Sequence, residues 1–140
     1  MDVLVGAGPT GLALAARAVA HGTAVRVVDR TPTAAYESRA LLLQPRTLEV
    51  LAGLRVTDEL LARGSRTVRL ALHAGRRVVV VPLFASQAET ETVLAAYLEH
   101  PGVEVERGTE LVGLEQGAEE IHCRLVGADG EKTVTARYVV

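Results

Sequence analysis

The sequence predicts an α/β fold in which a parallel sheet carries helices on one face and an antiparallel β-meander on the other. Two observations support this fold class. The chain opens with a short apolar strand, a turn containing three glycines and an alanine-rich helix, an order typical of a strand–turn–helix unit. Near the other end, apolar and polar residues alternate with period two between turn signals, at 110–115, 121–126 and 133–140.

The turn after the first strand has the composition of a dinucleotide-binding loop. Residues 6–11 read Gly-Ala-Gly-Pro-Thr-Gly and follow the strand at 3–5. Gly6 allows a tight turn, Gly8 lets the backbone approach a pyrophosphate, and Gly11 lets the helix pack close to the strand. The free amides and positive dipole end of the helix at 9–21 favour an anion there. These residues predict a Rossmann-like dinucleotide site; the alternative is an ordinary glycine-containing loop.

An acidic residue at the end of the second predicted strand adds support to the prediction of a dinucleotide site. Gly22 is a helix stop, and the strand at 24–28 leads directly into Asp29. Asp29 follows the glycine loop at close to the spacing of roughly 20 residues expected for a carboxylate that binds the ribose hydroxyls of a dinucleotide. The alternative is a turn residue ahead of Pro32.

The middle of the chain predicts an insertion. We expect short helices at 47–51 and 57–64, a hairpin of strands at 68–72 and 78–81, a helix at 86–99 and a third core strand at 103–106. The excursion from 30 to 102 is long for a plain nicotinamide-binding domain and indicates a flavoprotein. The hairpin, about residues 66–84, is expected to belong to an inserted substrate region.

Composition limits the function classes. The 140 residues suffice for about one domain, the 49% hydrophobic content suffices for a core, and the net charge of −2 does not favour nucleic acid or a membrane surface. Cys123 is the single cysteine and the four histidines lack metal-ligand spacing, so we expect no metal site and a reducing, cytoplasmic location. The expected partner is a small molecule, with the oligomeric state left open.

Four segments together resemble the N-terminal part of the class A FAD-dependent aromatic hydroxylases, the p-hydroxybenzoate hydroxylase-like group. Within that group, the polyketide and phenol hydroxylases are the most similar. The matching segments are residues 3–12, 28–30, 38–40 followed by 43–49, and 87–91. The resemblance implies an FAD-dependent monooxygenase that hydroxylates an aromatic or polyketide substrate, with NADPH or NADH as co-substrate and O2.

The resemblance also implies FAD-binding roles for particular residues and no catalytic side chain. The pyrophosphate would lie on Gly6, Ala7, Gly8, Pro9, Thr10 and Gly11. On the adenosine side, Asp29 would bind the ribose with Arg30 beside the adenine, and Leu111 and Val112 would offer backbone groups to the adenine edge. On the flavin side, Arg39 would reach the phosphate and ribityl region, and Ala40 would leave room beside the flavin. Gln87 would hydrogen-bond the ribityl chain or a phosphate. A solvated loop arginine and a polar helix-start residue are the alternatives for Arg39 and Gln87.

Two departures from the family pattern lead us to expect a partial FAD-binding domain over 1–140, truncated after Val140. Residues 127–130 resemble the second flavin motif of the family, but they lie between alternating strands and predict a hairpin turn. The family motif follows the strand that here is 136–140. The segment at 82–86 is shorter than its family counterpart. An NAD-dependent dehydrogenase domain and a nucleotide-binding fragment without catalysis stay open as alternatives.

Overall fold

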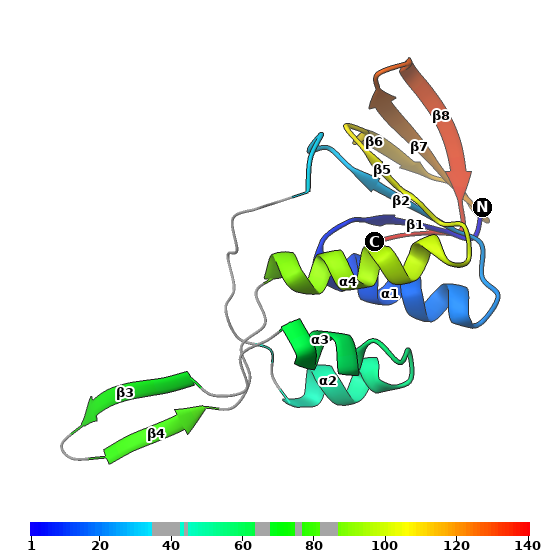
Figure 1. The fold of residues 1–140 in the computed structure, drawn as a ribbon. Coiled ribbons are helices and arrows are strands. Elements are labelled where there is room, and N and C mark those ends of the chain that lie inside the picture. The colour runs from blue at the N-terminus through cyan, green and yellow to red at the C-terminus, as the bar shows by residue number, and fades with distance from the viewer. Residues whose placement is uncertain (35–42, 44, 64–67, 75–76, 82–86) are drawn as a thin grey trace.

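A four-stranded parallel sheet lies between a helical layer and a meander (Figure 1). The computed structural model describes residues 1–34, 43, 45–63, 68–74, 77–81 and 87–140. The sheet has the order β5-β2-β1-β9, with β1 at Val3–Gly6, β2 at Val25–Asp29, β5 at Val105–Arg107 and β9 at Tyr138–Val139. The second sheet contains β6 at Glu110–Gln116, β7 at Ile121–Gly127 and β8 at Gly130–Ala136. The predicted fold class is confirmed.

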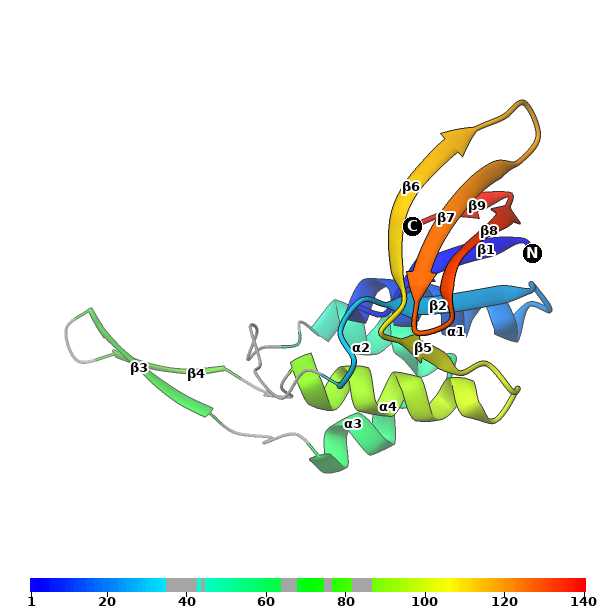
Figure 2. The same cartoon turned by 90° about the horizontal axis from the view of Figure 1, so that it is seen from above.

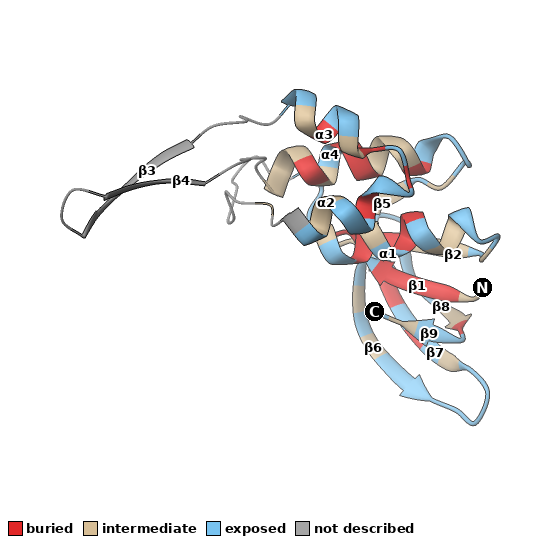
Figure 3. Ribbon diagram, turned by 90° about the horizontal axis from the view of Figure 1, so that it is seen from below, coloured by how far each residue is buried: buried red, intermediate tan, exposed pale blue. Residues whose placement is uncertain are grey.

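The sheet separates two apolar cores because strand side chains alternate between its faces. Val3, Val5 and Val27 belong to the core shared with the helices. Their neighbours Leu4 and Val28 belong to the smaller core under the meander. Figure 3 shows the buried residues concentrated where the helices meet the sheet. The sheet is therefore buried on both faces, as parallel sheets generally are.

The helical layer has two levels (Figure 1). Next to the sheet, α1 at Pro9–Ala20 packs beside α4 at Gln87–Glu99. Ala15 and Ala16 are fully buried, so their small side chains allow close packing. Below them lie α2 at Pro45–Ala52 and α3 at Thr57–Arg63, which add Leu51 and Leu60 to the same core. None of the helices in the described ranges has the length and apolar character needed to cross a bilayer.

The predicted hairpin is present. The strand β3 at Val68–Ala74 pairs antiparallel with β4 at Arg77–Val81. This hairpin projects away from the layered part of the chain (Figure 2). The short segment at 82–86 and the expected helix start at Ser86 lie outside the described residues.

The expectation of a single meander strand at 133–140 is wrong. The strand β8 ends at Ala136, and the chain then crosses to the parallel sheet, where β9 runs beside β1. The crossing is fixed at Asp2, whose carbonyl oxygen accepts hydrogen bonds from the amides of both Arg137 and Tyr138. Because the period-two pattern runs through the crossing, periodicity cannot detect a change of sheet.

The turn at 127–130 joins β7 to β8, as predicted. Gly127 pairs with Gly130 across this turn, and Gly130 has a φ of 94°, which favours glycine. Asp129 is exposed and pairs with Lys132 at 2.9 Å. This hydrogen bond and charge lower the pKa of the Asp129 carboxyl. A hairpin turn thus accounts for this Gly-Asp sequence.

We expect Cys123 to be unreactive in the folded chain. Its side chain is fully buried in the core under the meander, and burial raises the pKa of the thiol. Little of the nucleophilic thiolate therefore forms at mildly alkaline pH. A disulfide reagent such as Ellman's should react with the folded chain much more slowly than with the chain in guanidinium chloride. Equal rates in both solutions would contradict this packing.

Candidate dinucleotide site

The glycine loop is anchored at the carboxyl ends of three neighbouring strands. The Gly6 amide donates to the Val140 carbonyl oxygen at 2.9 Å, and the Ala7 amide donates to the Val28 carbonyl oxygen at 3.0 Å. Ala7 is buried, whereas Gly6 and Gly8 are exposed. The sheet thus holds the start of the loop and leaves its outer side accessible.

The N-terminus of α1 is open to an anion. Gly8 is its N-cap, with φ −73° and ψ 170°, and no side chain in the described part of the chain caps the first turn. Pro9 opens the helix, and the first turn contains no acidic residue. Because the first amides of a helix lack intrahelical partners and lie at its positive dipole end, this end favours a phosphate.

The three glycines of the loop have different surroundings. A Cβ added at Gly11 would lie 1.9 Å from the carbonyl oxygen of Gly6, so this glycine permits the contact between α1 and β1. A Cβ added at Gly6 or Gly8 would meet no atom of the described residues within 4 Å. Open space above exposed glycines, next to uncapped helix amides, is what a pyrophosphate requires, so the residues present fit this group.

Asp29 lies at the same sheet edge, at the carboxyl end of β2. Its Oδ1 accepts hydrogen bonds from the Thr31 amide at 3.0 Å and the Thr31 hydroxyl at 2.6 Å. Its Oδ2 accepts a hydrogen bond from Arg107 Nη1 at 2.6 Å. Arg30 follows and is exposed. The carboxylate therefore occupies a fixed position on the strand beside the loop.

Arg107 is a residue of this site that the sequence did not predict. The third core strand was expected to end at residue 106, but β5 runs to Arg107, which pairs in parallel register with Asp29. The next two residues also contact the Asp29 loop, since the Gly108 amide donates to the Thr31 carbonyl oxygen and the Thr109 amide donates to that of Asp29. The signal that could have identified Arg107 is the predicted parallel arrangement of the two strands, which places the last residue of one strand beside the last residue of its neighbour.

The segment expected to face the adenine contains a β-bulge. The register of β6 and β7 shifts between Leu111 and Gly113, so Val112 has no paired residue in that register. A bulge leaves backbone groups of its extra residue outside the ladder. Leu111 packs against the core under the meander, whereas 44% of Val112 is exposed. Val112 is therefore the more exposed of the two residues, whereas Leu111 is partly buried.

The remaining expected residues fall at one end of the helical layer or outside the described part. Gln87 is the first residue of α4, and α1 and α4 both begin at the sheet edge that carries the loop (Figure 1). Its Nε2 donates to Glu91 Oε1 at 2.8 Å, and the side chain is half-buried. Arg39 and Ala40 lie outside the described residues.

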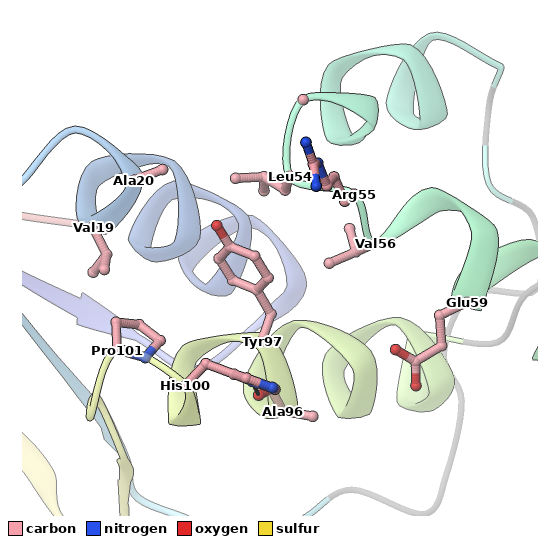
Figure 4. A pocket seen from close by; sticks show the side chains of 11 residues that line it. Val19, Ala20, Leu54, Arg55, Val56, Glu59, Ala96, Tyr97, His100 and Pro101 are labelled. Atoms are coloured by element: carbon pink, nitrogen blue, oxygen red, sulfur yellow. Dashed lines mark hydrogen bonds between the residues drawn. The ribbon is translucent and has the colours of Figure 1, made fainter.

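A hollow of about 720 Å³ lies at the opposite end of the helices (Figure 4). It is formed by the ends of α1 and α4 and by the connection between α2 and α3, with Leu54, Val56 and Tyr97 in its wall. The length of α1, about 18 Å for its 12 residues, separates it from the glycine loop. It therefore lies apart from the candidate dinucleotide site.

The comparison with protein families agrees with this geometry. The model described as "FAD binding domain" matches residues 1–140. The chain belongs to the FAD-binding domain family. The resemblance to FAD-dependent aromatic hydroxylases is confirmed by its relatives, which are aromatic and polyketide monooxygenases.

Two relatives from Streptomyces match almost the whole chain. It is 32% identical to 6-methylpretetramide 4-monooxygenase of Streptomyces rimosus, over 99% of this chain and 27% of that protein. It is 35% identical to rifampicin monooxygenase of Streptomyces venezuelae, over 99% of this chain and 30% of that protein. The crystal structure of aklavinone-11 hydroxylase with FAD and aklavinone superposes with a TM-score of 0.83 at 29% identity, over 99% of this chain and 32% of that chain.

These comparisons favour the hydroxylase interpretation over the dehydrogenase alternative, because the matched relatives are monooxygenases and hydroxylases. The chain spans between a quarter and a third of the length of the two relatives described above.

Proposed function

We propose that this chain is the dinucleotide-binding part of an FAD-dependent monooxygenase that hydroxylates an aromatic or polyketide substrate with NADPH or NADH and O2. The observation that supports it best is the open space at Gly6 and Gly8, at an uncapped helix start, beside the fixed carboxylate of Asp29. When bound, FAD would supply the redox chemistry.

In this proposal the chain's own residues bind and orient the cofactor. Residues 6–11 hold the pyrophosphate through backbone amides and the dipole of α1. Asp29 accepts a hydrogen bond from the adenosine ribose, and Arg30 flanks the adenine. The backbone at Leu111 and Val112 faces the adenine edge. Arg39, Ala40 and Gln87 contribute on the flavin side, as the family resemblance implies, and no catalytic residue is assigned to this chain.

The names of the relatives support the proposed substrate class. They include an aklavinone 12-hydroxylase from Streptomyces peucetius and an anhydrotetracycline monooxygenase from Streptomyces rimosus. We propose an aromatic polyketide as the substrate, with the β3–β4 hairpin as part of the substrate region. NADPH consumption that depends on added phenolic or polyketide substrate would test the activity itself.

Flavin absorption tests the cofactor directly. The purified chain is incubated with FAD and desalted, and its visible spectrum is recorded. A retained flavin band with a protein-perturbed shape is the expected result. A colourless protein after desalting, with no change in FAD fluorescence on titration, would overturn the proposed FAD site in this chain.

We expect Asp29→Asn to weaken FAD binding by about tenfold to a hundredfold. The substitution preserves the shape of the side chain but removes the charge that strengthens its hydrogen bond to a ribose hydroxyl, and charged hydrogen bonds are worth about 1.5–3 kcal/mol. The dissociation constant is measured by titration of FAD fluorescence, with melting temperatures recorded to check folding.

The matched control is Asp129→Asn, in the exposed turn between β7 and β8. It makes the same chemical change in the Gly-Asp sequence that resembles a flavin motif. We expect its FAD affinity to equal that of the wild type. Equal losses in the two variants would contradict the assignment of the ribose site to Asp29.

A further inference from the structure

A shielded ion pair joins the carboxyl ends of β2 and β5. Asp29 and Arg107 are direct neighbours in the parallel register, and Arg107 Nη1 lies 2.6 Å from Asp29 Oδ2. Only 25% of the Arg107 side chain and 21% of the Asp29 side chain are exposed. Because water screens such a pair less than an exposed one, it can hold a defined geometry.

The donors around Asp29 leave its two oxygens unequal. Oδ1 accepts hydrogen bonds from both the amide and the hydroxyl of Thr31, whereas Oδ2 accepts one from Arg107. A carboxylate has about two acceptor positions on each oxygen. The described protein groups therefore fill Oδ1 and leave acceptor capacity on Oδ2, which is the oxygen that Arg107 holds.

The backbone on either side reinforces this arrangement. Thr109 donates its amide to the Asp29 carbonyl oxygen at 2.9 Å, and Gly108 donates its amide to that of Thr31 at 3.1 Å. Gly108 has a φ of 68°, a conformation that favours glycine and that turns the chain directly after Arg107. Residues 107–109 thus contact residues 29–31 through one side chain and two amides.

We propose that Arg107 is a positioning residue, which holds the Asp29 carboxylate so that Oδ2 can accept a hydrogen bond from one hydroxyl of the adenosine ribose. This inference rests on the proposed FAD site. Arg107 acts through Asp29 and does not itself contact the ribose. Because the carboxylate is fixed before the ligand arrives, binding does not need to restrict its side-chain torsions, which preserves affinity.

The chain provides a matched ion pair between the same two strands. Arg26 donates to Glu106 through Nε at 2.5 Å and through Nη2 at 2.7 Å, and 26% of its side chain is exposed. Arg26 lies earlier on β2, away from the carboxyl end that carries Asp29. Substitution there removes a comparable cross-strand pair and leaves the contacts of Asp29 intact.

The experiment compares Arg107→Met with Arg26→Met in the full chain. Methionine keeps much of the buried stem and removes the charge. FAD dissociation constants come from fluorescence titration, and urea unfolding reports the stability of each variant. We expect Arg107→Met to raise the dissociation constant for FAD by about tenfold, which corresponds to about 1.4 kcal/mol. Arg26→Met should leave it within about twofold of wild type, whatever its stability.

Two further variants separate positioning from a structural role. Arg107→Lys restores the charge and should recover part of the lost affinity, although a lysine lacks the planar donor fork. In the double variant of Arg107→Met and Asp29→Asn, the loss should be close to that of Asp29→Asn by itself, because both changes act on one hydrogen bond.

Additive losses, or equal FAD affinities in Arg107→Met and Arg26→Met, would overturn the inference while leaving the proposed function intact. A wild-type chain that does not bind FAD would overturn the proposed function and this inference together.

Discussion

Gly11→Ala is expected to destabilise the chain severely. The added methyl group would lie 1.9 Å from the Gly6 carbonyl oxygen and 3.0 Å from its carbonyl carbon. These are backbone atoms at the end of β1, which is paired with β2 on one side and β9 on the other, so they cannot move without disturbing the sheet. Overpacking usually costs about 1–3 kcal/mol, and we expect a loss of at least about 3 kcal/mol here because no flexible side chain can yield.

Urea unfolding followed by circular dichroism measures this effect as a change in the free energy of unfolding. The control is Gly53→Ala, whose new methyl group would meet, among the described residues, just the end of the Arg17 side chain, at 2.7 Å. That side chain can rotate away, so the control should be much more stable than Gly11→Ala. Similar stabilities for the two variants would show that α1 does not pack against β1 as described.

Gly8→Ala is expected to weaken FAD binding strongly while changing the free energy of unfolding only slightly. A methyl group at this position would meet no atom within 4 Å among the residues that the structure describes, and the φ of −73° is accessible to alanine. Alanine is a poorer N-cap than glycine, so the free energy of unfolding should fall by at most about 1 kcal/mol. The same methyl group would occupy the space through which a pyrophosphate approaches the backbone. FAD affinity should therefore fall by about a hundredfold or more, which is about 2.7 kcal/mol.

Titration of FAD fluorescence and urea unfolding, both on the same preparation, measure these two quantities. Gly53→Ala again serves as the control and should retain wild-type affinity, because it lies at the opposite end of α1 from the loop. If Gly8→Ala binds FAD as tightly as the wild type, the pyrophosphate does not lie over this loop.

Local chemistry was sufficient to predict most of the elements and the position of the loop. Gly22 has a φ of 76° and ends α1, which glycine does at little steric cost. The alternating segments that became β6, β7 and most of β8 pair as a meander, because alternation with period two is itself the property that gives a strand one buried face. Asp29 likewise lies next to the loop because parallel strands bring their carboxyl ends to one edge.

The tertiary structure decided the features that depend on pairing between distant segments. Arg107 and Asp29 are 78 residues apart, and only the register of β2 with β5 brings them together. The crossing to β9 depends on the Asp2 carbonyl, and the bulge at Val112 depends on how β6 meets β7. A residue's own spacing and polarity encode its local conformation and the face it buries, but not the identity of its neighbour on another strand. For that physical reason the glycine loop and Asp29 could be predicted as site residues from the chain itself, whereas the residue that hydrogen-bonds Asp29 from the neighbouring strand could be identified only in the folded sheet.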